Sequence, residues 1–539
     1  MFRVNMKKLI CAVSGRKKPQ RSDSKRRLME KNNNNSVQGG YADILVQNAF
    51  NTEEERPLRQ EKDGSLQELF ELLGEDSDTN TNTSGDGACC SGQHNLQQRV
   101  VHIIRRHLSQ RFPKPPADLD QNLWVHLRTV KEVVFDQFPM LSPLLESRGM
   151  MGCVVDCYHR HTFDHLHGLI QNVSSSNNSF VLMDWFVHTY LSHEALGRPD
   201  QQLLGQWAVK AKTKLLEHVQ KEIRGILSGI LQNERGQQRC DSVEAYVWLY
   251  VDTIQCVAAK PTTARTISSE LHDQVQEVCF RELLTFVLRY TAEKKEFLGN
   301  KAEMDPPETI HFLKTLKTCK ELRQYVEAEG RGVESSLLDQ IVATLKDMED
   351  FTLKLLMEII VDIAESHLKK YFRSDSRRCY LFAALENLFP KLSYVSDELK
   401  RVVDQAYKLV AHLYLKHLIQ TNRRKLKQRW SPNVEQTVQE DAKQLHRTMS
   451  NLAPGVQQWN LMLLDIPEVL ECKCMEALKM TVAQIEKKCN KQSEDLALLP
   501  ALLRWKGLSK RQVREVMEAL PSGRPVAGSG SWFFCLPCW

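Results

Sequence analysis

Hydrophobic residues along most of this chain recur at steps of three and four positions, which is the period of an amphipathic helix. Segment 335–368 keeps this spacing throughout, with apolar positions at Leu338, Ile341, Val342, Leu345, Met348, Leu355, Leu356, Ile359, Ile360 and Ile363. Segment 398–418 repeats it at Leu399, Val402, Val403, Ala406, Val410 and Leu413. Each segment is predicted to form a helix of about 20 residues or more, with one face buried against neighbouring helices.

Prolines divide the chain, because a proline ends or kinks a helix. They leave long proline-free intervals at 144–198, 200–260, 262–305, 308–389 and 391–431. No stretch shows the alternation of a β-hairpin, a βαβ rhythm or a fixed repeat. The pattern predicts an all-α fold, an elongated rod of consecutive helical bundles of the tethering-complex type.

The ends of the chain differ from its middle. Leu66, Leu69, Phe70, Leu72 and Leu73 fit one short amphipathic helix, followed by a polar stretch at 75–92 that is predicted to be a flexible linker. The predicted organisation is a disordered polybasic arm at 1–40, a linker with one helix at 41–94, N-terminal helical bundles at 95–305, C-terminal helical bundles at 306–520 and a tail at 521–539. The apolar end of this tail, 532–539, is expected to dock onto the last bundle or to contact a membrane or partner.

Composition supports this picture and narrows the compartment. Glycine and proline are scarce, at 24 and 19 of 539 residues, which favours long uninterrupted helices. The 15 cysteines are odd in number and irregularly spaced, as in proteins of a reducing cytosol. No run reaches the 18 or so apolar residues of a membrane span, so a cytoplasmic protein is expected.

Charge is concentrated at the beginning of the chain. Residues 1–31 carry a net charge of +9, whereas the whole chain carries +6, so that the remaining residues carry −3. A basic arm of this kind is predicted to bind an anionic membrane surface, since each cation near such a surface contributes about 1 kcal/mol. The predicted membrane-binding residues are Lys7, Lys8, Arg16, Lys17, Lys18, Arg21, Lys25, Arg26 and Arg27, and Cys11 is a candidate for lipidation.

The alternative for the arm is a nuclear import signal or a phosphate-binding arm on a nucleic-acid-associated protein. The net negative body argues against nucleic acid as a partner. A second group of basic residues, near the end of helix 399–418, has two interpretations: favourable pairing with the helix dipole on a solvated face, or docking of an acidic partner such as a small GTPase or phosphoinositide headgroups. These predicted partner-binding residues are Arg423, Arg424, Lys425, Lys427 and Arg429.

The sequence lacks the common motifs of enzyme active sites. It contains no phosphate-binding glycine loop, no H-E-x-x-H and no G-x-S-x-G. Cys153, Cys157, His161 and His165 follow one another at four-residue steps, but four ligands on one helix cannot surround a metal, so a second helix would have to contribute.

A packed helix is therefore the favoured interpretation of this segment, with its cysteines lining the core and His159 and His167 facing water; a metallohydrolase centred on His161 and His165 is the alternative. Free thiols are expected at Cys89, Cys90, Cys472 and Cys474. No metal, cofactor, small-molecule substrate or enzymatic activity is expected.

Four stretches resemble the exocyst complex component 3 family, and most closely its branch of tumour necrosis factor alpha-induced protein 2 and exocyst complex component 3-like proteins. They are "DWFVHTYLSHEALGRPD" (184–200), "ARTISSELHDQVQEVCFRELLTFVLRYTAEKKEF" (264–297), "LENLFPKLSYVSDELK" (385–400) and "ALLRWKGLSKRQVREVMEAL" (501–520), with marker residues Trp185, Tyr190, Pro199, Phe389 and Pro390. The resemblance covers roughly 95–520. It implies a tethering scaffold of exocytosis and plasma-membrane remodelling, peripheral at the plasma membrane. The partners it implies are exocyst subunits, SNARE proteins, Ral-type small GTPases and phosphoinositide-rich membrane.

Overall fold

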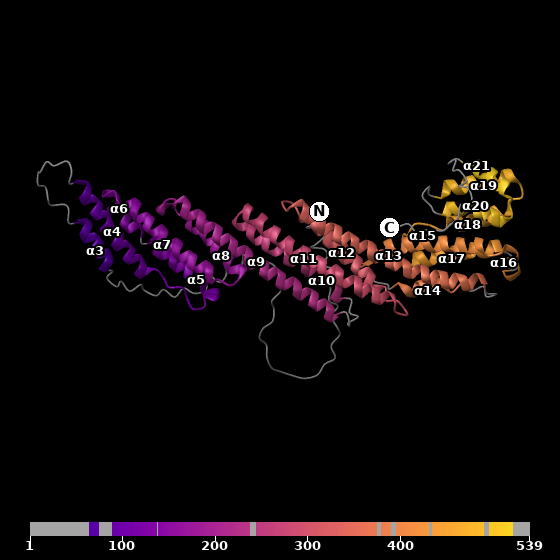
Figure 1. The fold of residues 1–539 in the computed structure, drawn as a ribbon, viewed down its shortest axis with the longest axis horizontal. Coiled ribbons are helices and arrows are strands. Elements are labelled where there is room, and N and C mark those ends of the chain that lie inside the picture. Colours follow the sequence, from indigo (N-terminus) through magenta and orange to yellow (C-terminus); the bar gives the residue numbers. More distant parts are fainter. Residues whose placement is uncertain are drawn as a thin grey trace, which may run out of the picture. The chain divides into compact units, whose positions relative to one another are not determined.

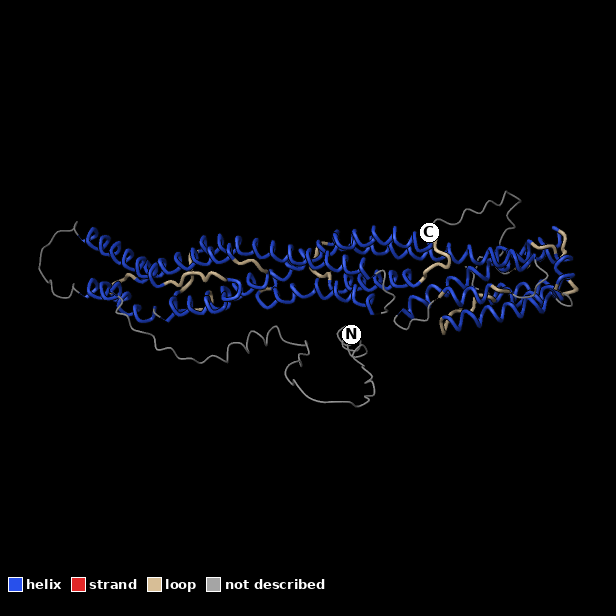
Figure 2. Tube along the Cα trace, turned by 90° about the horizontal axis from the view of Figure 1, so that it is seen from below, coloured by secondary structure: helices blue, strands red, loops and turns tan. Residues whose placement is uncertain are grey.

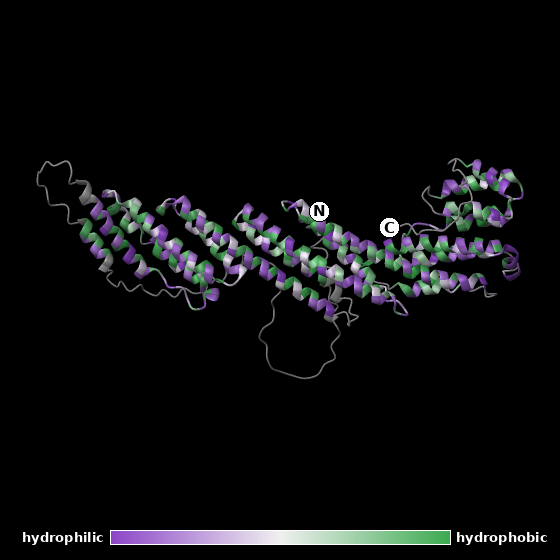
Figure 3. Ribbon diagram, viewed as in Figure 1, coloured by the Kyte–Doolittle hydropathy of each residue, from purple (hydrophilic) through white to green (hydrophobic). Residues whose placement is uncertain are grey.

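Regular secondary structure in the described part of the chain is entirely helical, which confirms the all-α prediction (Figure 2). The computed structural model describes residues 64–74, 89–136, 138–237, 244–373, 379–389, 395–430, 434–489 and 495–520. Both hydrophobic (green) and hydrophilic (purple) residues recur along the helices in Figure 3, as expected for amphipathic helices. The elongated shape of the whole molecule stays a prediction.

The helices at the N-terminal side begin earlier than the sequence predicts. They are α3 (Gly64–Gly74), α4 (Cys89–Arg111), α5 (Leu119–Lys131), α6 (Phe138–Ser147), α7 (Met151–Asn172) and α8 (Ser176–Trp185), with short helices η2 (Glu132–Asp136), η3 (Phe186–Tyr190) and η4 (Glu194–Leu196) between them (Figure 1). The predicted short helix is confirmed as α3, but it is not isolated in a linker: Leu69 and Leu73 are buried, and Arg148 Nη2 donates to the Leu73 carbonyl at 2.7 Å. The folded body therefore starts near residue 64, and α4 occupies part of the stretch predicted as linker.

The middle of the chain consists of long helices held in register by charge. They are α9 (Gln201–Gln237), α10 (Glu244–Ile267), α11 (Ser269–Ala302), α12 (Ile310–Glu329) and α13 (Ser335–Arg373). Three ion pairs link α9 to α11 with a constant separation of 58 residues: Lys212–Glu270, Arg224–Glu282 and Arg235–Glu293. A constant separation means that α9 and α11 run in the same direction, with α10 returning between them.

Two predicted helix boundaries are wrong, because Pro143 lies inside α6 and Pro261 lies inside α10. Helix α10 continues through Pro261 to Ile267, although a proline lacks the N–H that a helix interior needs. Val257 and Ala264, on either side of Pro261, are fully buried, and His272 bonds the Pro261 carbonyl through Nδ1 at 2.8 Å. This packing outweighs the lost hydrogen bond. The break falls instead at Ser268, whose side chain accepts from Leu271 N and caps α11.

The two helices that the apolar spacing predicts most clearly are confirmed as α13, of 39 residues, and α15 (Ser396–Gln420). The C-terminal side contains α14 (Leu381–Leu388), α16 (Arg423–Arg429), α17 (Val434–Leu452), α18 (Leu461–Glu471), α19 (Met475–Lys488), α20 (Asp495–Lys506) and α21 (Lys510–Glu518). Helices from both sides of residue 305 pack together, α11 with α13 and α10 with α12. The predicted division into bundles stays a prediction, and the arm and the tail lie outside the described residues.

Candidate functional site

The predicted membrane arm is not part of the described structure. Its nine basic residues and Cys11, like the apolar tail and the thiols of Cys89 and Cys90, lie outside the residues whose side chains are described. Within the described ranges, no helix combines the length and the apolar character needed to cross a bilayer. The candidate surfaces that follow belong to the described body.

The predicted partner-binding residues form a helix of their own. Helix α15 ends at Gln420, and α16 begins after Asn422, whose side chain accepts hydrogen bonds from Arg424 N (3.0 Å) and Lys425 N (3.3 Å). Leu426 and Trp430 are buried and fix this helix to the body. The basic residues thus do not extend α15 but form a separate helix that begins three residues after α15 ends.

Two of the five basic residues are engaged inside the protein. Arg423 Nη1 donates to the Lys506 carbonyl at 2.6 Å, and its Nη2 lies 3.5 Å from Glu435 Oε1. Arg429 Nη1 donates to the Phe372 carbonyl at 3.1 Å. The other three, Arg424, Lys425 and Lys427, are exposed, with Lys427 Nζ 4.0 Å from Glu435 Oε1. The outward charge of α16 comes from these three residues.

A second basic segment, which the sequence analysis missed, adjoins α16. Trp505 Nε1 donates to the Thr421 carbonyl at 2.7 Å, and the Arg423 guanidinium lies 5.7 Å from the centroid of the Trp505 ring. Residues 504–514 contain five basic side chains and no acidic one. This local absence of carboxylates was the sequence signal that could have identified the segment.

Trp430, the anchor of α16, lies near a partly buried carboxylate, Asp441, in the C-terminal bundle. Trp430 packs 5.0 Å from Tyr371 between ring centroids, and Tyr371 and Tyr414 both donate to Asp441 Oδ2 at 2.6 Å. Burial raises the pKa of Asp441 to about 6, although the two phenol hydrogen bonds favour its ionised form. Three helices, α13, α15 and α17, meet at this carboxylate.

The cysteine and histidine row on α7 is part of the packed core. Cys157 is buried and Cys153 partly buried, as predicted, and both thiols are free. The structure does bring a second helix to this row: His126 of α5 lies with its Nε2 2.8 Å from His165 Nε2. Among the described residues, however, no three potential ligands are placed to hold a metal ion.

The prediction that His159 faces water is wrong. His159 is buried, its Nδ1 lies 2.7 Å from the Tyr190 hydroxyl, and its Nε2 lies 3.2 Å from the Leu196 carbonyl. Both ring nitrogens thus have partners, which removes the cost of burying the imidazole. His167 is partly buried. Tyr190 belongs to an aromatic cluster with Trp185, Phe186 and Phe163, so that the two marker residues of the family resemblance in this cluster, Trp185 and Tyr190, are packing residues.

Cys472 and Cys474 are free thiols, as predicted. The Cys472 thiol lies 3.3 Å from Thr481 Oγ1, and Cys474 Sγ accepts from Ala477 N at the start of α19. Both have local structural roles.

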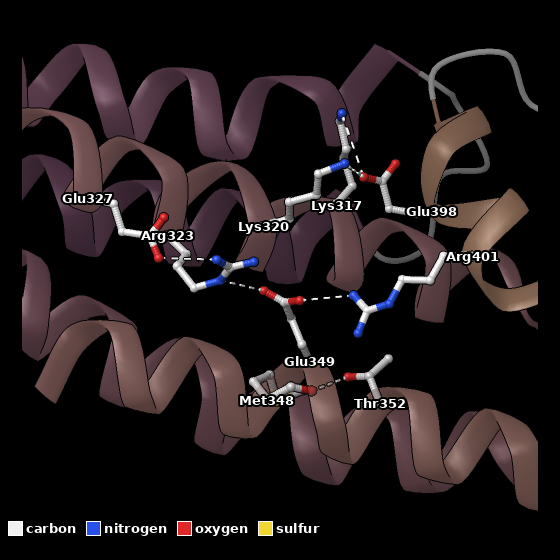
Figure 4. Close-up of polar contacts among 9 residues, drawn as sticks. All are labelled: Lys317, Lys320, Arg323, Glu327, Met348, Glu349, Thr352, Glu398 and Arg401. Carbon is white, nitrogen blue, oxygen red and sulfur yellow. Dashed lines mark hydrogen bonds and ion pairs between the residues drawn. The ribbon is translucent and has the colours of Figure 1, made fainter. Parts of the chain in front are cut away.

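A buried network of charges joins α12, α13 and α15 (Figure 4). Glu349 of α13, with 5% of its side chain exposed, lies between Arg323 Nε of α12 (3.1 Å) and Arg401 Nη1 of α15 (3.2 Å). Glu398 of α15 receives Lys320 Nζ at 2.8 Å, with Lys317 Nζ at 3.9 Å. The network links the three helices through charged side chains that pair with one another.

Comparison with known proteins gives a fold. No protein-family model matches the chain. The crystal structure of M-Sec superposes on it with a TM-score of 0.55 and 16% sequence identity, covering 86% of this chain and 84% of the M-Sec chain. A circular tandem repeat protein aligns over 80% of this chain and 94% of its own, at 13% identity, but its TM-score of 0.17 indicates no shared fold. The chain therefore has a helical-bundle fold of the M-Sec type.

Proposed function

We propose that this chain is a non-enzymatic tethering scaffold of the exocyst complex component 3 type. The observation that carries the proposal is the M-Sec-like fold, which extends over most of both chains. It agrees with the resemblance of segments 184–200, 264–297, 385–400 and 501–520 to that family. Helical scaffolds of this kind act by presenting surfaces to partners, and the buried networks of the body serve stability.

Three kinds of protein partner follow from the proposal: exocyst subunits, SNARE proteins and a Ral-type small GTPase. The protein is cytoplasmic and peripheral at the plasma membrane, where it acts in exocytosis and membrane protrusion. Arg424, Lys425 and Lys427 are exposed and suit an acidic ligand, while Arg423 and Arg429 hold α16 in place.

The basic arm attaches the scaffold to anionic, phosphoinositide-rich membrane. Nine cations within residues 7–27 give reversible binding that weakens with salt, because exposed charges are screened over about 8 Å at physiological ionic strength. Lipidation of Cys11 would strengthen this attachment. A fluorescent fusion of residues 1–40 should decorate the plasma membrane, and accumulation in the nucleus would favour an import signal instead.

Direct binding with purified components tests the proposal. The full chain, immobilised, is mixed with purified exocyst subunits, with SNARE proteins, and with a Ral-type GTPase loaded with GTP or GDP. Binding of exocyst subunits, and preference for the GTP form, are expected. A chain that binds none of them at micromolar concentration is not a scaffold of this type.

A further inference from the structure

Two segments far apart in the sequence share an unusual composition. Residues 423–429 and 504–514 contain five basic side chains each and no carboxylate. They are Arg423, Arg424, Lys425, Lys427 and Arg429 in the first, and Arg504, Lys506, Lys510, Arg511 and Arg514 in the second.

The fold brings these segments together. Helices α15 and α20 run side by side in the same direction, because His412 pairs with Asp495 at the start of α20, and the carbonyl of Thr421, the C-cap of α15, accepts from Trp505 near the end of α20. At the junction of the two segments, the Trp505 indole donates a hydrogen bond to the Thr421 carbonyl. The end of α20 therefore lies beside the start of α16, and α21 follows α20 after the turn at Gly507.

Seven of the ten basic side chains are exposed. Arg423 and Arg429 bond backbone carbonyls, and Lys506 Nζ donates to the carbonyls of Leu470 (3.0 Å) and Cys472 (2.7 Å). The exposed residues, called here the composite basic surface, are Arg424, Lys425, Lys427, Arg504, Lys510, Arg511 and Arg514.

The neighbouring carboxylates leave this surface positive. Glu435 pairs with the inward-facing Arg423 and lies 4.0 Å from Lys427 Nζ, and Glu515 of α21 pairs with Lys479 of α19 at 2.8 Å, so that these two carboxylates offset only part of the seven exposed positive charges. No large hydrophobic side chain of 423–429 or 504–514 is strongly exposed, and the apolar side chains Trp505 and Leu508 among the cations are partly buried. Protein interfaces are built around an apolar, charge-depleted core, which this surface lacks.

We propose that the composite basic surface binds the headgroups of an anionic lipid bilayer. The inference rests on the proposed function and deepens it, because it gives the scaffold a second membrane contact besides its arm. A layer of headgroups presents diffuse negative charge and needs no apolar anchor, which matches exposed Lys and Arg side chains without a hydrophobic centre. Two contacts on one chain bind more tightly than either alone, since the second engages at a high effective concentration.

Vesicle sedimentation tests this with the full chain at 150 mM salt. The vesicles contain phosphatidylcholine alone, or phosphatidylcholine with phosphatidylserine and a phosphoinositide. The surface variant carries Arg504→Ala, Lys510→Ala, Arg511→Ala and Arg514→Ala. The matched control removes four exposed lysines elsewhere on the body, Lys210, Lys346, Lys354 and Lys369, by substitution with alanine. Circular dichroism and thermal melting verify that each variant is folded.

The surface variant should bind anionic vesicles about tenfold more weakly than the parent chain, and the control within about twofold, because only charges close to the bilayer contribute. An arm variant with Lys17, Lys18, Arg26 and Arg27 changed to alanine separates the two contacts. It should keep measurable binding, which the added surface substitutions abolish. If the parent chain itself fails to pellet, the membrane part of the proposed function is wrong.

If the surface variant pellets like the control in both backgrounds, the arm is the whole membrane contact and the inference is overturned. A single-stranded RNA oligonucleotide and a GTP-loaded Ral-type GTPase serve as competing probes. Tighter binding of either probe than of vesicles, lost in the surface variant, would assign the surface to that ligand and likewise overturn the lipid assignment.

Discussion

The Nε2 atoms of His126 and His165 lie 2.8 Å apart, so that one imidazole donates its N–H to the other. Such a pair shares one proton and is stable only while at least one ring is neutral. Burial, together with the neighbouring His126 and His161, lowers the pKa of His165 to about 4. The contact between α5 and α7 is therefore sensitive to acid.

The first prediction concerns this contact. A lowered pKa means that the unfolded segment binds more protons between pH 4 and 6.5, so local stability is fully present above pH 6.5 and is lost as the pH falls toward 4. The loss should reach about 3 kcal/mol. Hydrogen exchange of α5 and α7 at pH 7 and pH 4.5 measures it. His165→Asn should flatten this dependence, and an unchanged dependence in the variant would contradict the assignment.

The second prediction concerns Asp441, whose contribution to stability changes with pH in the opposite direction. The pKa of Asp441 is raised to about 6 by burial, so its contribution is fully present below about pH 3.8 and is lost as the pH rises through 6. Asp441→Asn should slow hydrogen exchange of α17 at pH 7 by an amount that corresponds to up to about 3 kcal/mol of added stability. It should also remove the change of this stability with pH between pH 4 and 6. The amide oxygen can still accept from Tyr371 and Tyr414. Weaker protection in the variant would show that the ionised carboxylate is stabilising.

The third prediction concerns the network around Glu349. Glu349→Gln leaves Arg323 and Arg401 without their shared carboxylate and should loosen α12, α13 and α15 by about 2 kcal/mol. Arg401→Gln should cost less, because 45% of the Arg401 side chain is exposed and Arg323 remains to pair with Glu349. Exposed Asp350 on the same helix, changed to Asn, is the matched control. Equal effects of Glu349→Gln and Asp350→Asn on stability would show that the network does not stabilise these helices.

The fourth prediction concerns the anchor of α16. Trp430 is 1% exposed and packs against both Tyr371 and Phe372, with ring centroids 5.0 and 5.2 Å apart. Trp430→Ala should destabilise the C-terminal bundle by about 3–5 kcal/mol, because it leaves a large cavity. Proteolysis near α16 should accelerate accordingly. Trp430→Phe should recover most of the stability, and no difference between the two variants would argue against the packing described.

The helical fold was predictable because it depends on local periodicity. The spacing of apolar residues in 335–368 and 398–418 identified α13 and α15 without any knowledge of their neighbours. Pro261 was misjudged because the packing that holds α10 together around it involves a different helix, through His272.

The side-chain contacts were not predictable from local pattern. His159 looked exposed because its partners, Tyr190 and Leu196, lie 31 and 37 residues away. The contact of Trp505 with Thr421 spans 84 residues, so that the proximity of the second basic segment to α16 became visible only in the structure. Charge composition identified the first basic segment, the second was missed, and the fold shows that the two adjoin.

Recruitment of purified exocyst subunits to a supported bilayer that contains a phosphoinositide tests the central claim most directly. The account predicts that the subunits accumulate on the bilayer only when the full chain is present. It also predicts that combining the arm and composite-surface substitutions releases chain and subunits together. A full chain that binds the bilayer but recruits no subunit would contradict the assignment of this protein as a tethering scaffold.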